Sequence, residues 1–147
     1  MRTVLKRVAL GAIVLLALIQ LVPYGRAHTD PTPSREARFQ DASTQKLFDG
    51  ACADCHSDHT SWPLYSNVAP VSWLVQNDVD GGRRRMNLSE WDKRQPDLAE
   101  IQDVIIGGGM PPLQYKVLHG KARLSAAERQ QLAAGFRVLF ASQPPGP

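Results

Sequence analysis

Cysteine is scarce in this sequence of 147 residues: there are only two, and both lie in the stretch Cys52-Ala53-Asp54-Cys55-His56. If that stretch acts as a unit, no cysteine is left for a structural disulfide. A convincing alternation of apolar and polar residues is also missing, and no internal repeat is visible. These absences argue against a β-sheet domain and a repeat protein. No paired carboxylates indicate acid–base catalysis, and we assign no catalytic residue.

A one-sided charge is missing as well. The formal net charge is +3, and Arg2, Lys6 and Arg7 account for all of it, because the other basic residues equal the acidic residues in number. The rest of the chain therefore carries no excess of the basic residues that bind nucleic acid. We expect no nucleic-acid partner.

The five residues from Cys52 to His56 form a C-x-x-C-H motif, which is typical of c-type haem attachment. Two thiols three positions apart lie about one helical turn from each other, so both can form thioethers with the vinyl groups on one edge of a haem. His56 then lies close enough to place an imidazole nitrogen on the iron. The motif predicts one covalently attached haem c, with His56 as a metal ligand.

The cysteine pair has two other interpretations, a redox dithiol and a zinc site. A thioredoxin-like dithiol needs a βαβ surround, and no strand-rich pattern flanks the motif. A zinc site could combine both cysteines with two of the four histidines. Structural zinc sites usually bring a second closely spaced ligand pair, however, and His119 stands alone. Haem attachment therefore explains all five residues better.

The N-terminus has the pattern of an export signal or anchor. Residues Met1 to Arg7 are basic, and the uncharged run from Val8 to Val22 is broken only by Gln20. No A-x-A cleavage signature follows, and Pro23-Tyr24 resembles an interfacial boundary. We expect residues 1–24 to form an uncleaved transmembrane helix, with a cleaved signal as the alternative. In either case the haem domain would face the periplasm, at the inner membrane of a bacterium.

The remaining chain predicts one small all-α domain. Residues 25–40 are polar and contain Pro31 and Pro33, which fits a tether. Residues 41–142 form the predicted haem-binding domain, and residues 143–147 are a tail. Such a chain buries only a modest core by itself, so a porphyrin would complete its centre.

Helix signals recur along this domain. A helix capped by Asp41 or Ser43 should deliver the cysteines at its end. The other expected elements are a helix from Pro70 to Gly81-Gly82, a turn capped by Ser89, a helix begun by Asp97 and Glu100 and ended by Gly107, and a last helix begun by Ser125 and Glu128.

Met110 is the best candidate for the second iron ligand. It lies in Gly107-Gly108-Gly109-Met110-Pro111-Pro112, where glycines permit a close approach to a flat macrocycle and prolines stiffen the loop. A thioether would raise the reduction potential. The alternative is an ordinary buried methionine. The other candidates are His119, the main rival, and then Met86 and His28. His59 follows His56 by only three residues and would lie on the same side of the ring. Arg83-Arg84-Arg85 is interpreted mainly as a solvated helix end, with a haem propionate as the alternative partner.

Several tracts stand out besides the motif: Val22-Pro23-Tyr24-Gly25-Arg26, the segment from Trp62 to Trp73, Gly82-Arg83-Arg84, Ser89-Glu90-Trp91 and Gly109-Met110-Pro111-Pro112. With Cys52 to His56, they resemble the small, membrane-associated bacterial haem-binding domain proteins, and the likeness extends from Val22 to Phe140. The resemblance implies a cytochrome-c-like fold in which Cys52, Cys55, His56 and Met110 match the attaching and ligating positions. The glycines before Met110 depart from the charged residue expected there.

The sequence thus favours a membrane-anchored monohaem c-type cytochrome that transfers single electrons between redox partner proteins outside the cytoplasm. Such a protein is an electron carrier rather than a catalyst. Two alternatives remain open: a haem-based sensor or peroxidase-like enzyme with an open or labile distal position, and a haem-bearing structural subunit of a larger complex.

Overall fold

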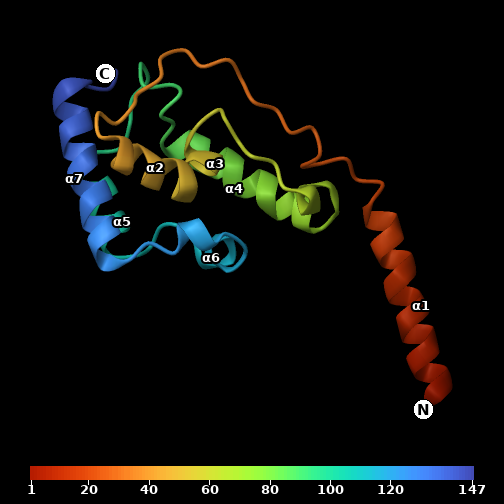
Figure 1. The fold of residues 1–147 in the computed structure, drawn as a ribbon. Coiled ribbons are helices and arrows are strands. Elements are labelled where there is room, and N and C mark those ends of the chain that lie inside the picture. Colours follow the sequence, from red (N-terminus) through yellow and green to blue (C-terminus); the bar gives the residue numbers. More distant parts are fainter. The chain divides into compact units, whose positions relative to one another are not determined.

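Helices make up all the regular structure of the protein. The computed structural model describes residues 1–147 and contains no strand, only an isolated bridge between Arg35 and Glu90. The elements are α1 (Arg2–Ile19), α2 (Ala42–Ala51), α3 (Ala53–His56), η1 (Leu64–Asn67), α4 (Val71–Arg85), α5 (Leu98–Ile106), α6 (Leu113–Leu118), η2 (Gly120–Ala122) and α7 (Ala126–Ser142) (Figure 1). The all-α prediction is confirmed.

The chain divides into two compact units, and each contains part of α4. Unit 1 comprises Met1–Thr29 and Trp62–Asp78, and unit 2 comprises Asp30–Ser61 and Val79–Pro147. The C-x-x-C-H motif and the last turns of α4 both belong to unit 2. The site can therefore be described within that unit alone.

The core of unit 2 forms where α7 packs against α5 and α2 (Figure 1). Phe136 of α7 is fully buried and makes edge contacts with Phe39 and Phe48, at centroid distances of 5.1 and 6.2 Å. Phe39 and Ala37 lie in the stretch that we expected to be a tether, and both are buried in this core. Because Phe48 lies on α2, this packing fixes the helix that leads into the cysteines.

Helix starts largely follow the capping signals. Asp41 caps α2 by accepting from the Thr44 amide at 2.8 Å. Ser125 and Glu128 form the expected capping box of α7, with bonds of 3.2 and 2.7 Å. At α5, Asp97 is the N-cap residue but makes no side-chain cap bond. The start of α5 is confirmed and its capping box is not.

The predicted end of α4 at Gly81-Gly82 is wrong, because the helix continues to Arg85. Glycine weakens a helix interior but does not forbid it. At position 82, the close approach of Cys55 explains why a glycine is present.

In unit 1, the segment after α1 packs along the tract from Trp62 to Trp73. The side chain of Gln20 donates to the Ala69 carbonyl at 2.9 Å and accepts from the Ala69 amide at 3.0 Å. Gly25 has a φ of +79°, and a Cβ there would lie 2.2 Å from the Ser72 carbonyl oxygen. His28 stacks on Trp62 at a centroid distance of 4.5 Å. Two of the tracts that resemble the haem-binding domain proteins therefore contact each other.

The N-terminal helix differs from the one that we expected. None of the helices combines the length and the apolar character needed to cross a membrane. The expected transmembrane helix over residues 1–24 is thus not supported. The helix that forms, α1, has 18 residues, and Arg2, Lys6 and Arg7 are among them.

Candidate functional site

The two cysteines lie at the junction of α2 and α3. Cys52 follows the last residue of α2, and its carbonyl accepts from the amides of Cys55 and His56 at 3.1 and 2.9 Å. The thiols are partly buried and form no disulfide. Burial, with a smaller contribution from Cys55, raises the pKa of the Cys52 thiol to about 12. The motif therefore forms one tight turn that carries both thiols.

The backbone of α4 lies directly on this turn. A Cβ at Gly82 would lie 2.3 Å from the Cys55 carbonyl oxygen and 2.8 Å from the Cys55 Cβ. Real Cβ atoms do not approach other atoms so closely, so only glycine fits at position 82. Gly82 serves close packing rather than helix termination, and a glycine within a continuing helical pattern was the available signal.

His56 is held from two sides by the segment that follows α4. Its Nδ1 lies 3.0 Å from the Met86 carbonyl oxygen, and its own carbonyl accepts from the Leu88 amide at 2.9 Å. A carbonyl can only accept, so Nδ1 donates and the lone pair of the ring lies on Nε2. Burial lowers the pKa of His56, against smaller raising contributions from the backbone of Met86 and Gly82. The imidazole is thereby kept in the neutral form that binds a metal.

This donor set fits a haem. Two thiols are available for thioethers, and a neutral imidazole is oriented at Nδ1 by a carbonyl, which is the usual arrangement of metal-ligating histidines. No group of three or more His, Cys, Asp or Glu side chains is arranged to hold a metal ion. The zinc site weighed from the sequence therefore finds no support in the side-chain arrangement.

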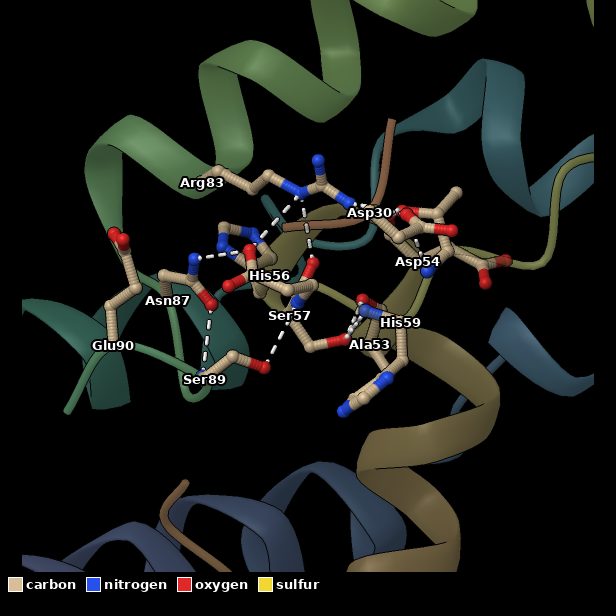
Figure 2. Close-up of polar contacts among 12 residues, drawn as sticks. Asp30, Ala53, Asp54, His56, Ser57, His59, Arg83, Asn87, Ser89 and Glu90 are labelled. Carbon is tan, nitrogen blue, oxygen red and sulfur yellow. Dashed lines mark hydrogen bonds and ion pairs between the residues drawn. The ribbon is translucent and has the colours of Figure 1, made fainter. Parts of the chain in front are cut away.

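A buried polar cluster lies beside His56, and we define the Asp58 cluster as Asp58, Arg83, Asn87 and Ser89. Asn87 Nδ2 donates to Asp58 Oδ1 at 2.8 Å, and Asn87 Oδ1 accepts from the Ser89 amide at 2.9 Å. Ser89 Oγ accepts from the Asp58 amide at 2.9 Å. Figure 2 shows Asn87 and Ser89 beside His56 and Ser57. Our prediction that Ser89 caps a helical turn is wrong, because its hydroxyl serves this cluster.

Arg83 also differs from the solvated helix end that we expected. Its Nε donates to the Ser57 carbonyl at 3.0 Å, and its Nη2 donates to Asp30 at 2.8 Å and to Thr60 at 3.0 Å (Figure 2). Only 13% of its side chain is exposed. Arg85 is exposed and pairs with Glu100, as the expectation requires. Of the three arginines, Arg83 thus holds the segment that follows the motif in place by hydrogen bonds to Ser57 and Thr60.

Met110 lies in an exposed loop between α5 and α6, with 42% of its surface accessible. Gly108 has a φ of +74°, a left-handed conformation that favours glycine two residues before Met110. Beyond the loop, the Tyr115 hydroxyl donates to Asp54 Oδ2 at 2.6 Å. This bond ties the helix after Met110 to the C-x-x-C-H motif. Neither Tyr115 nor Asp54 was singled out from the sequence.

The other candidate ligands have partners elsewhere. His119 stacks on Tyr115 at 3.9 Å, and its Nδ1 contacts the Tyr115 carbonyl oxygen at 3.0 Å. His59 contacts Glu36 and is largely exposed, and Met86 is buried beside His56. His28 belongs to unit 1. The structure thus brings Cys52, Cys55 and His56 together, and the ligand assignment of Met110 stays a prediction.

Comparison with known proteins gives two matches. A family model described as a haem-binding domain matches residues 14–137, which include the whole C-x-x-C-H motif. The chain is also 27% identical over 96 residues to cytochrome c peroxidase Ccp of Escherichia coli (strain K12). That alignment covers 60% of this chain and 21% of the peroxidase, so the chain spans about a fifth of that relative. No solved structure matches the chain.

The family match covers most of the chain. This protein belongs to the haem-binding domain family.

Proposed function

We propose that the protein is a monohaem c-type cytochrome whose haem is attached through Cys52 and Cys55 and ligated by His56. The observation that carries the proposal is the hydrogen bond between His56 Nδ1 and the Met86 carbonyl, immediately beside the two thiols. Bound in this way, the haem would supply a one-electron couple between Fe(III) and Fe(II). The protein would then be an electron carrier.

The residues around the motif have distinct tasks in this proposal. The turn at Cys52 sets the spacing of the two thiols, and Gly82 permits α4 to cover that turn. The Met86 carbonyl fixes the orientation of the His56 ring, so that Nε2 presents its lone pair to iron. Burial of the ring lowers the pKa of His56 and so disfavours protonation of that lone pair.

Met110 is the proposed second ligand. The glycine at position 108 lets its loop turn sharply, and the bond from Tyr115 to Asp54 keeps the following helix near the motif. A thioether in this position stabilises Fe(II) relative to a second imidazole and raises the reduction potential. The accessible surface of Met110 gives its sulfur room to move toward a cofactor.

A second candidate function is a peroxidase-like enzyme with a labile distal position. The observation that favours it is the similarity to a protein named cytochrome c peroxidase. In that case Met110 would leave the iron readily, and the reduced protein would bind carbon monoxide without any mutation. If the protein is an electron carrier instead, its reduced form should not bind carbon monoxide.

We further propose that the haem domain works outside the cytoplasm of a bacterium, at the periplasmic face of the inner membrane. The basic start and the apolar run of α1, which has no buried residue, support export. The partners would be redox proteins that make small, transient contacts. Fractionation, with mass spectrometry of the N-terminal peptide, tests both location and processing.

The proposal is tested by producing the protein in a host competent in c-type cytochrome maturation. We expect denatured protein to retain one haem, seen as haem stain on a denaturing gel and as the mass of one added haem. Cys52→Ser and Cys55→Ser should each reduce the retained pigment, and His56→Ala should change the absorption spectrum. His59→Ala is the matched control, because His59 is exposed and contacts Glu36. A wild-type protein without retained pigment would refute the proposal.

A further inference from the structure

Asp58 lies two residues after His56 and is buried, with 2% of its surface exposed. Its Oδ1 accepts from Asn87 and lies 3.6 Å from Arg83 Nε. Its Oδ2 is buried and has no hydrogen-bond partner. A buried carboxylate with one unsatisfied oxygen destabilises a fold, so such a group calls for an explanation other than packing.

Asn87 connects Asp58 to the carbonyl that orients His56. It directly follows Met86, and the Asp58 cluster closes a ring of hydrogen bonds through Asn87 and Ser89 (Figure 2). Residues 86–89 are therefore joined to residues 56–58 by four hydrogen bonds: His56–Met86, Leu88–His56, Asn87–Asp58 and Asp58–Ser89. A shift of the Met86 carbonyl relative to His56 would strain the other bonds as well, including the one between Asn87 and Asp58.

The charge of Asp58 is opposed by nearby cations. Arg83 forms ion pairs with two carboxylates, Asp58 at 3.6 Å and Asp30 at 2.8 Å, and Lys93 also interacts electrostatically with Asp58. Asp58 is much more buried than Asp30, whose side chain is 36% exposed. A charge in a low-dielectric interior acts over a longer range than one facing water. The charge of Asp58 is therefore screened less than that of Asp30 and makes the surroundings of His56 more negative.

We propose that Asp58 is a positioning residue for the haem: through Asn87 it fixes the Met86 carbonyl against His56, and its charge, opposed by Arg83, lowers the reduction potential. The proposal rests on haem ligation by His56, which is part of the proposed function. A negative charge stabilises Fe(III), which carries one more positive charge than Fe(II). Asp58 thus counteracts the effect that a methionine ligand has on the potential.

The test is redox potentiometry of purified holoprotein carrying single substitutions. Asp58→Asn keeps the shape of the side chain and an acceptor for Asn87 but removes the charge, so the potential should rise. Arg83→Gln removes the opposing cation, so the potential should fall. A general opening of the fold would move both potentials in the same direction. Opposite shifts therefore distinguish an electrostatic role from a structural one.

Asp30→Asn is the matched control, because Asp30 contacts the same guanidinium but is more exposed than Asp58. Its upward shift should be smaller than that of Asp58→Asn. Arg83→Lys keeps the charge and should retain most of the wild-type potential. If Asp58→Asn does not fold, the comparison of Arg83→Gln with Arg83→Lys decides the question.

The proposal is overturned if Asp58→Asn leaves the potential unchanged, if it shifts the potential in the same direction as Arg83→Gln, or if Asp30→Asn has an equal or larger effect. If Asp58→Asn does not fold, equal potentials for Arg83→Gln and Arg83→Lys overturn it. Its failure is distinct from failure of the proposed function. Wild-type protein without covalent pigment refutes the haem assignment, whereas pigmented protein with unmoved potentials refutes only the role of Asp58.

Discussion

Gly82 and Cys55 are in such close contact that the backbone of α4 leaves no room for a side chain at position 82. We predict that Gly82→Ala forces α4 away from the motif. Overpacking of this kind costs about 1–3 kcal/mol of unfolding free energy. Urea unfolding measures the loss, and the fraction of protein with retained haem should fall with it.

The neighbouring glycine provides the control for this prediction. A Cβ at Gly81 would meet only the far end of the Arg84 side chain, at 4.0 Å. Gly81→Ala should therefore raise stability by about 0.5–1 kcal/mol, because alanine is the better helix former. Equal effects of the two substitutions would show that the contact with Cys55 does not matter.

Met110→Ala should remove the weak red-region absorption that sulfur ligation gives oxidised haem, and should lower the reduction potential. The reduced variant should also bind carbon monoxide, because one face of the iron would be open. Met86→Leu is the control, since Met86 contacts His56 through its backbone carbonyl, which the substitution retains. An unchanged spectrum in Met110→Ala would reject the ligand assignment and favour His119 or an open position.

Asp41 makes the stability of α2 depend on pH. Hydrogen bonds from the Ser43 and Thr44 side chains, followed by the Thr44 amide, hold the pKa of Asp41 below its usual range. A carboxylate with a lowered pKa in the folded state stabilises the fold at pH values above its unfolded pKa of about 4, and this stabilisation is lost as the pH falls. We expect Asp41→Ala to lower the unfolding midpoint at pH 7 and to reduce its decline below pH about 4.

The substitution Asp41→Asn removes the charge but keeps a side chain that can cap α2. Asn caps helices about as well as Asp, so Asp41→Asn should keep the stability at pH 7 and lose part of the acid dependence. The midpoint of urea unfolding measured between pH 2 and pH 7 shows both effects. An acid dependence identical to that of the wild type would mean that other carboxylates dominate.

Gln20→Ala should loosen the contact between the end of α1 and Ala69 in unit 1. The substitution removes two hydrogen bonds, each of which contributes about 1 kcal/mol. The Ala69 amide should then exchange its hydrogen roughly tenfold faster or more. Amides of the buried core around Phe136 provide the internal control and should keep their exchange rates. Unchanged exchange at Ala69 would show that the bonds do not persist in solution.

Local sequence signals predicted the elements that local chemistry determines. Asp41 and Ser125 mark helix starts because their side chains accept hydrogen bonds from amides three residues away. The stretch Cys52 to His56 predicts a haem site because all its members are adjacent in sequence. Such patterns can be read from a few residues, and the corresponding helices form where we expected them.

The errors concern residues whose partners are distant in sequence. Gly82 was interpreted as a helix terminator because nothing in its neighbourhood indicates Cys55. Ser89 has the local pattern of a cap but serves Asp58, and Arg83 binds Asp30 rather than water. The carbonyl of Met86 has no signal at all, because a backbone group is the same in every residue. Tertiary contacts decided these positions, and one sequence does not reveal them.

The carbonyl that orients His56 comes from a residue 30 positions further along the chain. A short synthetic peptide spanning only the C-x-x-C-H motif would therefore contain both thiols and the imidazole but would lack the group that aligns the ring. Fragments that end before Met86 would show the intrinsic behaviour of the motif, and the difference from the intact chain would measure what folding adds.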